Sequence, residues 1–394
     1  MTSTETFRRT SAEINLDHLL HNWNAIQNIA GDDRFICPMI KANAYGHGAP
    51  EVAQALDREG AKSFGVCLIE EGLRLRAAGI KSEILVFSGF DKQGAEKILE
   101  YQMVPVVSSW QQIKALEAAA DEPVKVHLKF DTGMNRLGFF ADDCEKLVDY
   151  FKKSKLLKLK AVLSHLAVSE DCIDPAGMSI QQLKRLSEVH HFFGTEKVFA
   201  HVLNSGGILS LRSLNSHPVK GTESVVQPHW GFRPGILLYG YKPTGPFGDL
   251  EIKPVMNFRS VVNNMRVVAP GESVSYGATW RASRKSHIAV VPVGYADGVH
   301  RALSNRGSVL IGGMRLPIVG VVCMDFLMVD VTELVESSGR ADWTDESVTI
   351  FGYDENGLLE SADSTANELR TISWEILTSV SHRVPRHFKG LKKS

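Results

Sequence analysis

A lysine stands at the end of an apolar run, in a setting that suits covalent chemistry. Lys41 follows the run Phe35–Ile40, and the next residues, Ala42–Gly48, include two glycines. At the end of a buried strand an amine can stay partly uncharged and form a Schiff base with a carbonyl compound. The small residues behind the lysine allow the backbone to approach a ligand closely. Taken alone, however, the pattern is explained more simply by a lysine that leaves the core for solvent.

Further polar groups fall at the ends of later apolar runs, and one, Arg233, stands just before the last run. Each has a plain explanation as a satisfied core histidine, a helix cap or a surface arginine. The carboxyl ends of parallel barrel strands, however, meet at one mouth, where barrel enzymes build their active sites. Their joint position therefore favours one site shared with Lys41. The groups are Lys129, Asp131, His165, Asn204, Ser205 and Arg233.

The elements that would position these groups alternate between strands and helices. Stretches 49–59, 70–78 and 179–193 carry apolar residues at helical spacing, with short β-branched runs between such stretches. This alternation predicts a parallel sheet, and eight units match a (β/α)8 barrel. An open doubly wound sheet is the alternative, but no GxGxxG motif follows an early run. The eight runs are Phe35–Ile40, Ser63–Leu68, Glu83–Phe87, Val104–Val107, Val124–Phe130, Leu159–Ser164, Val198–Leu203 and Gly235–Tyr239.

The pattern changes at the turn-rich stretch Lys242–Pro246, which suits a domain junction. One helix is expected beyond it, opening with the capping box of Thr365 and Glu368. Strands dominate elsewhere. We therefore expect an α/β chain, with an N-terminal (β/α)8 barrel over 12–245 and a mostly β C-terminal domain over 246–394, to which residues 1–11 add. The expected strands are 259–268, 286–293, 308–311, 316–323, 326–331 and 347–351.

Composition limits the classes of protein that need to be considered. The 394 residues carry a net charge of -1, which gives no electrostatic case for binding nucleic acid or an anionic membrane. No apolar stretch approaches the length of a membrane span, and the first residues lack the apolar core of a secretory signal. The 5 cysteines are odd in number and scattered, which indicates reduced thiols and no metal site. We expect a cytoplasmic enzyme.

Six motifs, taken together, resemble those of the alanine racemase family. Each motif is weak alone, but the set follows the family's order and covers nearly the whole chain. The motifs are Lys41–Gly48, Lys129–Gly138, Val274–Gly277, Gly294–Gly298, Cys323–Asp325 and Arg383–Arg386.

The resemblance implies a cofactor and a mechanism. Lys41 would carry pyridoxal 5'-phosphate as an internal aldimine, and the chain would racemise L-alanine and D-alanine with Lys41 and Tyr276 as two bases on opposite faces. Inversion needs a proton to leave on one side and return on the other, and a tyrosine needs tuning to act as a base near neutral pH. His165 and Arg233 would link Tyr276 to the pyridine nitrogen. Arginine donates a hydrogen bond without giving up its proton, which favours brief carbanions.

The remaining roles also come from the resemblance. It implies a homodimer with shared active sites that makes D-alanine for peptidoglycan precursors. Lys129 would be carbamylated and orient Arg136, with Asp325 in a supporting role. The substrate carboxylate would contact Arg136 and Met324. The cofactor would contact Tyr45, Asn204, Ser205, Arg233, Gly235 and Ile236. The entrance would be lined by Tyr295, Arg301, Val321 and His382.

The sequence departs from the family's usual residues near the expected entrance. Val321 stands where many members have arginine, Phe326 where they often have glutamine, and His382 where several have tyrosine. A broader-specificity or serine racemase on the same fold is therefore an alternative. A related diamino-acid decarboxylase and a non-catalytic cofactor carrier are further alternatives. Arg233 argues against the decarboxylase, and Tyr276 with the second domain argues against the carrier.

Overall fold

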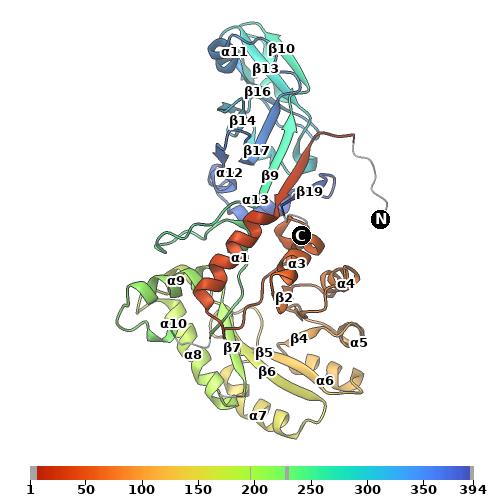
Figure 1. Ribbon diagram of the computed structural model, residues 1–394, viewed down its shortest axis with the longest axis vertical. Helices are drawn as coiled ribbons and strands as arrows, with labels where there is room; N and C mark the ends of the chain where they lie inside the picture. Colours follow the sequence, from red (N-terminus) through yellow and green to blue (C-terminus); the bar gives the residue numbers. More distant parts are fainter. Residues whose placement is uncertain (1–6, 196, 227–229, 391–394) are drawn as a thin grey trace. The chain divides into compact units, whose positions relative to one another are not determined.

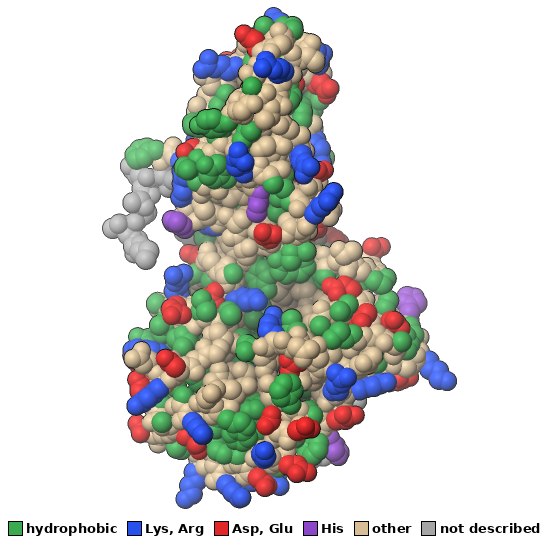
Figure 2. Space-filling view, turned by 180° about the vertical axis from the view of Figure 1, so that it is seen from behind, with side chains coloured by type: hydrophobic (Ala, Val, Ile, Leu, Met, Phe, Trp, Pro, Cys, Tyr) green, Lys and Arg blue, Asp and Glu red, His purple; other side chains and the backbone are tan. Residues whose placement is uncertain are grey.

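The computed structural model describes residues 7–195, 197–226 and 230–390 and divides the chain into two compact units. The barrel unit comprises Leu19–Ala44 and Ala49–Lys253. The β unit comprises the described residues up to His18, Tyr45–Gly48 and the chain from Pro254 onward. Among the described residues, no helix is both long enough and apolar enough to cross a bilayer. Acidic and basic side chains are interspersed over the face shown in Figure 2, in keeping with the net charge of -1.

The barrel unit is a parallel sheet with helices between its strands (Figure 1). Its seven strands pair in chain order, β2-β3-β4-β5-β6-β7-β8. They are β2 (Ser63–Val66), β3 (Glu83–Val86), β4 (Val104–Val107), β5 (Val124–Lys129), β6 (Leu157–Leu163), β7 (Phe199–Leu203) and β8 (Trp230–Phe232). The helices are α1 (Leu16–Ala30), which begins in the β unit, the left-handed turn α2 (Lys41–Tyr45), which ends in the β unit, α3 (Ala49–Arg58), α4 (Ile69–Ala77), α5 (Lys92–Glu100), α6 (Trp110–Ala119), α7 (Cys144–Lys153), α8 (Met178–Phe193), α9 (Ser205–Ser216) and α10 (Glu223–Val226).

The sheet closes through the segment 35–40, which was predicted as the first strand. Its bridges join Ile36 to Phe232 of β8 and Met39 to Gly65 of β2, both in parallel. The Met39 N–H donates to the Pro234 oxygen at 2.8 Å, and the Ile40 N–H to the Gly65 oxygen at 2.9 Å. Pro38 has no N–H, so the segment makes separate bridges and no continuous ladder. The closing segment therefore completes the barrel and delivers Lys41 to its mouth.

The last predicted strand of the barrel is wrong. Residues 236–239 form the short 3-10 helix η3 (Ile236–Tyr239), and the strand in this part of the chain is Trp230–Phe232. All four residues of η3 are buried. A short apolar run that is buried throughout has no alternation to distinguish strand from helix, which explains the error. The correction moves Arg233 from before the last strand to directly behind it.

The β unit is built on a sheet that the N-terminal part of the chain joins. β1 (Ser11–Asn15) lies between β9 (Met256–Val261), which is antiparallel to it, and β19 (Arg386–Lys389), which is parallel. The order in the sheet is β15-β14-β17-β9-β1-β19, with β18 paired to β17, and a second sheet has the order β10-β13-β16. The remaining bounds are β10 (Asn264–Val268), β11 (Ser273–Val274), β12 (Trp280–Arg281), β13 (Ser286–Val291), β14 (Ser308–Ile311), β15 (Met314–Pro317), β16 (Leu327–Asp330), β17 (Ser347–Tyr353) and β18 (Leu359–Glu360).

Several predicted boundaries in the β unit need correction. The expected strand 259–268 is two strands, β9 and β10, and the strand expected over 316–323 ends as β15 at Pro317. Thr365 does not open a helix. It lies inside α12 (Ala362–Leu369), whose cap is Ser361 with its hydroxyl accepting from the Asp363 N–H at 3.1 Å. Arg370 then adopts the left-handed conformation, so a second helix, α13 (Ser373–Ser379), follows in place of one long one.

The predicted fold class is confirmed by these elements. A parallel barrel with alternating helices is followed by a mostly β part, which also contains α11 (Thr332–Ser338). The predicted helices 49–59, 70–78 and 179–193 match α3, α4 and α8 within two residues at each end. This agreement matters for the site, because strand ends at one mouth determine which side chains meet.

Candidate active site

Arg233 lies directly behind β8, with only 4% of its surface exposed. Its Nη1 donates to the His201 oxygen at 2.7 Å and to His201 Nδ1 at 2.9 Å. Its Nη2 lies 2.7 Å from the Ser164 oxygen, 3.2 Å from His165 Nδ1 and 3.4 Å from the Val202 oxygen. Within the part of the chain that the structure describes, all these acceptors bind the two terminal nitrogens, which leaves the Nε–H as a donor for a bound ligand.

The arginine fixes the proton positions of three histidines. Arginine only donates, so His165 and His201 must accept at Nδ1 and carry their protons on Nε2. The Nε2–H of His201 then donates to His127 Nδ1 at 2.9 Å. Burial and the nearby Arg233 charge hold the pKa of His201 well below its usual value. Burial, with Lys160 and Arg233, lowers the pKa of His127 to about 3. Neutral imidazoles therefore surround the buried cation.

Four cations predicted for the site lie within electrostatic reach of His165. Burial lowers the pKa of His165 well below its usual value, and the charges of Arg233, Arg136, Lys129 and Lys41 lower it further. Lys129, at the end of β5, is 7% exposed, and burial together with Arg136 and Arg233 lowers its pKa to about 8. The barrel mouth is therefore a cationic environment suited to an anionic ligand.

Lys41 is followed by a backbone turn in the left-handed conformation, which residues other than glycine rarely adopt. Ala42, Asn43 and Ala44 have φ of 51°, 54° and 54°, and Tyr45 has φ of 53°. A left-handed conformation costs L-residues roughly 1–2 kcal/mol each, so the surroundings must hold the turn in place. Such strain is typical of functional sites. Lys41 itself is half-buried, and Tyr45 is 7% exposed, which raises the pKa of its phenol.

Glu71 of α4 holds this turn, a role that sequence reasoning missed. Its Oε1 accepts from the Ala42 N–H at 2.6 Å. Its Oε2 accepts from the N–H groups of Cys67 and Leu68 at 2.8 and 3.0 Å. One carboxylate thus joins the lysine turn to the loop behind β2. The usual sequence signal of such a cap, a Ser or Thr three residues earlier, is absent because Leu68 stands there.

Asp131 shapes the loop that carries Arg136. Its carboxylate accepts from the N–H groups of Gly133 at 2.8 Å, Asn135 at 3.1 Å and Arg136 at 3.0 Å. Burial alone would raise its pKa, but these backbone donors lower the pKa below the usual value. A Cβ on Gly138 would lie 2.4 Å from the Asp131 nitrogen, so this glycine allows the loop to close on itself. Arg136 is exposed at the tip.

The predicted phosphate-binding residues gather at the start of α9. Asn204 caps this helix by accepting from the Gly207 N–H at 3.1 Å. The buried Ser205 hydroxyl accepts from the Gly235 N–H at 3.1 Å and the Leu237 N–H at 3.4 Å. A ligand that used the Gly235 amide would therefore compete with Ser205. Backbone N–H groups at a helix start are suited to phosphate.

Tyr276, the predicted second base, lies in the β unit and is 71% exposed. Residues with positive φ surround it, among them Ser275 at 68° and Ala278 at 48°. The Ser275 hydroxyl donates to the Val321 oxygen at 2.6 Å, which joins the tyrosine turn to the residues just before the Cys323–Asp325 motif. The geometry presents the phenol ring outward from its own unit.

The predicted substrate and entrance residues of the β unit come from separate stretches of the chain, two of which are hydrogen-bonded to each other. Met324 and Tyr295 are 52% and 42% exposed. They are joined through backbone hydrogen bonds, from Tyr295 N–H to the Cys323 oxygen and from Ala296 N–H to the Met324 oxygen, both 3.0 Å. Asp325 accepts from Arg383 Nη2 at 2.8 Å. Arg301 and His382 are exposed, and Val321 is half-buried.

The fold and site define a class of two-part enzymes, in which a parallel barrel with a strand-end lysine and a buried arginine precedes a mostly β domain. Family models agree. The N-terminal domain of alanine racemase matches residues 14–243, and the C-terminal domain matches residues 255–388. The chain belongs to the alanine racemase family and is a pyridoxal-phosphate-dependent enzyme of the isomerase class. The resemblance read from the motifs is thereby confirmed.

Individual relatives cover the chain almost completely. The alanine racemase of Sorangium cellulosum is 38% identical over an alignment 397 residues long, which covers 97% of this chain and 99% of that protein. The solved alanine racemase of Clostridium difficile 630 has a TM-score of 0.86 and 30% identity, covering 98% of this chain and 97% of that one. The structure from Bartonella henselae, with covalently bound pyridoxal phosphate, has a TM-score of 0.82 and 28% identity, covering 97% of this chain and 99% of that one.

The Asp131 loop gives a prediction about stability and its pH dependence. Asp131→Ala should lower the free energy of unfolding by about 1 kcal/mol at pH 7, the typical cost of losing a capping side chain. Because the pKa of Asp131 is lower in the folded protein than in the unfolded chain, its carboxylate stabilises the folded state at pH values above the unfolded pKa. This stabilisation is lost as the pH falls through the folded-state pKa. The difference from wild type should therefore narrow toward pH 3 in urea titrations. The exposed Asp149 of α7 is the control, and Asp149→Ala should leave stability unchanged. A difference that stays constant from pH 7 to pH 3 would contradict the proposed role of the carboxylate.

Proposed function

We propose that this protein interconverts L-alanine and D-alanine, with pyridoxal 5'-phosphate bound at the barrel mouth. The observation that carries the proposal is the buried Arg233 with its neutral histidines. Its terminal nitrogens are fully occupied, and its Nε–H is left as a donor for a ring nitrogen. Arginine stays protonated, so this donor does not pass its proton to the ring.

The residues at the mouth fit this cofactor. Lys41 offers the amine that would hold its aldehyde carbon, and the start of α9 with Ser205 offers donors for its phosphate. Tyr45 and the Ile236 amide would complete the phosphate contacts, and Asn204 would keep the helix start in place. When bound, the cofactor supplies an electron sink that makes the amino-acid α-hydrogen acidic. The cations around His165 suit its negative charge.

The protein's own groups then move the proton and hold the substrate. Lys41 would take or give the α-proton on one face, and Tyr276 on the other. The Nε2–H of His165 points away from Arg233 in the tautomer that this arginine imposes, and it would donate to the Tyr276 oxygen. Arg136 and the Met324 N–H would hold the substrate carboxylate. Asp325, Tyr295 and Arg301 would shape the approach to the site.

We also propose a homodimer in which each site takes Lys41 from one chain and Tyr276, Met324 and Asp325 from the other. The exposure of Tyr276 and Met324 supports this, because both present reactive or binding groups away from their own unit. A carbanion must be protected from water, so these groups need a covering partner. A two-fold axis pairs the same two surfaces twice and makes two equivalent sites.

The function itself is tested with a panel of amino acids and chiral product analysis. L-alanine should give D-alanine, and Lys41→Ala should reduce the rate by at least about a hundredfold through the loss of a catalytic base. Val321 and His382 replace larger or more polar residues of the family, so we expect detectable serine racemisation beside alanine. Carbon dioxide from diamino acids would indicate a decarboxylase, and no turnover at all would indicate a carrier. Alanine-only turnover would refute the broader specificity.

Lys129 should exist as a carbamate when the protein is exposed to carbon dioxide. Formation needs an uncharged amine, and a pKa of about 8 leaves more of it near neutral pH than an ordinary lysine has. ¹³C NMR in labelled bicarbonate should show a carbamate signal that weakens as the pH falls below 8 and is absent in Lys129→Ala. Activity of that variant should fall and partly recover with added acetate. The exposed Lys125 of the same strand is the control. Full activity of Lys129→Ala without acetate would show that the modification has no role.

The shared site is tested by mixing two inactive variants, Lys41→Ala and Tyr276→Phe, under subunit exchange. In each mixed dimer, one site receives both substitutions and the other receives neither. Random pairing makes about half of the dimers mixed, so roughly a quarter of wild-type activity should return. Mass spectrometry of tagged chains verifies the exchange. Activity that stays at the level of the separate variants would show that both residues act within one chain.

A further inference from the structure

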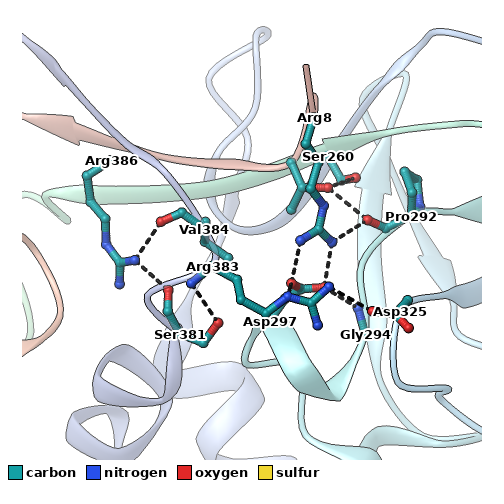
Figure 3. A network of polar contacts seen from close by, with 11 residues as sticks. Arg8, Ser260, Pro292, Gly294, Asp297, Asp325, Ser381, Arg383, Val384 and Arg386 are labelled. Carbon is teal, nitrogen blue, oxygen red and sulfur yellow. Dashed lines mark hydrogen bonds and ion pairs between the residues drawn. The ribbon is translucent and has the colours of Figure 1, made fainter. Parts of the chain in front are cut away.

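A carboxylate deep in the β unit holds two arginines. Asp297 has no exposed surface. Its oxygens accept from Arg8 Nη1 at 2.5 Å, Arg8 Nη2 at 2.6 Å and the Gly294 N–H at 3.0 Å, and Arg383 Nε lies 3.7 Å away (Figure 3). A buried charge is tolerated only when it is paired and hydrogen-bonded, so Asp297 depends on these partners. The bidentate contact from Arg8 is the closer of the two arginine contacts.

Arg8 comes from the segment before β1, outside the residues that the family models match. Besides binding Asp297, its Nη2 donates to the Pro292 oxygen at 2.8 Å. Thr10 donates to the same oxygen at 2.9 Å and contacts the Ser260 hydroxyl at 2.8 Å. The N-terminal segment is thereby joined to the end of β13 at the point where the chain enters the short helix η5 (Tyr295–Asp297).

That helix fixes the peptide that carries the Met324 N–H. The Tyr295 N–H donates to the Cys323 oxygen, and this oxygen belongs to the same planar peptide as the Met324 nitrogen. The direction of the N–H is therefore set by the position of Tyr295. Gly294 leaves no space for adjustment, because a Cβ there would lie 2.3 Å from the Cys323 oxygen and 2.4 Å from the Met324 oxygen.

A second connection reaches the neighbouring side chain. Arg383 lies beside Asp297 and donates from Nη2 to Asp325 at 2.8 Å (Figure 3). The Asp297 backbone oxygen also accepts from the Ser381 N–H at 3.0 Å, which holds the turn that leads to Arg383. The backbone of the 323–325 segment and the side chain of Asp325 are therefore both connected, through η5 and Arg383, to the buried Asp297 carboxylate.

We propose that Arg8 is a positioning residue for the reaction. It holds Asp297, and through η5 it aims the Met324 N–H at the substrate carboxylate. The inference rests on the proposed function, in which that N–H binds the carboxylate. Arg8 touches neither substrate nor cofactor, so its loss changes binding of the carboxylate and leaves the cofactor's environment intact.

The neighbouring residue provides a matched control. Arg9 also pairs with an aspartate at 2.5 Å, but the side chains of Arg9 and Asp345 are 54% and 76% exposed, and Arg9 donates to the carboxylate and the backbone oxygen of Asp345. Exposed ion pairs contribute little, so loss of this one should have no effect on the site. Arg8→Ala and Arg9→Ala therefore remove the same chemistry from adjacent positions, and only the first reaches Asp297.

The experiment uses the holoenzyme and two measures of carboxylate binding, the KM for each alanine enantiomer and the Ki of propionate, which is alanine without its amino group. Arg8→Ala should raise all three by roughly tenfold, short of the hundredfold that a 1 Å displacement can cost. The kcat should change by less than about twofold, since the bases are untouched. The visible absorbance of the bound cofactor should be unchanged, Arg8→Lys should give an intermediate value, and Arg9→Ala should match wild type.

The outcomes separate the inference from the proposed function. If wild type does not racemise alanine, the proposed function fails and the inference falls with it. If wild type is active and Arg8→Ala has the KM and Ki of Arg9→Ala, only the inference falls. A fall in kcat alone, with KM and Ki unchanged, also overturns it. If Arg8→Ala does not fold, Arg8→Lys and Arg9→Lys supply the same comparison, because lysine keeps the charge but cannot make the bidentate contact.

Discussion

A buried guanidinium governs the chemistry of the barrel mouth. Removing a charge from water is tolerated only if hydrogen-bond partners replace the water, and Arg233 finds them at the ends of β6 and β7. The Ser164 oxygen lies just past the end of β6, and the His201 oxygen lies in β7 where its pairing with β8 shifts register between His201 and Leu203. Burial is the largest cause of the lowered pKa values of His165, His201 and Lys129, and the Arg233 charge lowers them further. The proton positions of the histidines follow from this buried cation, and it adds to the effect of burial on the lysine.

The β unit contains a buried charge of the opposite sign, the carboxylate of Asp297. Asp297 collects donors from the N-terminal segment, from Gly294 and from the turn before β19. Each unit thus organises its part of the site around one buried charge whose partners come from distant segments. This arrangement is more directional than apolar packing, because hydrogen bonds fix angles as well as distances. It suits the proposed reaction, in which two bases would stand on opposite faces of one planar group.

The local pattern of apolar and polar residues predicted most helices and strands. It failed for a run that is buried on all sides and for contacts between distant parts of the chain. The strand-end residues Lys41, Lys129 and His165 were predictable because parallel strands bring their carboxyl ends together. The run 236–239 was assigned wrongly because it is buried all round. Glu71, His127, His201 and Arg8 were missed because their roles depend on contacts between distant parts of the chain. Glu71 reaches over 29 residues, the histidine pair over 74 and Arg8 over 289. No periodicity encodes such pairs.

The left-handed turn behind Lys41 bears on how far this fold could be stabilised. Ala42 and Ala44 hold φ values of 51° and 54°, which glycine would adopt without strain. Glycine at these positions would therefore relieve native-state strain, at the expense of a freer unfolded chain. It would also release the peptide that leads directly from the lysine. The balance of these two effects decides whether glycine would raise heat resistance, and any such gain would come with a looser turn behind the lysine.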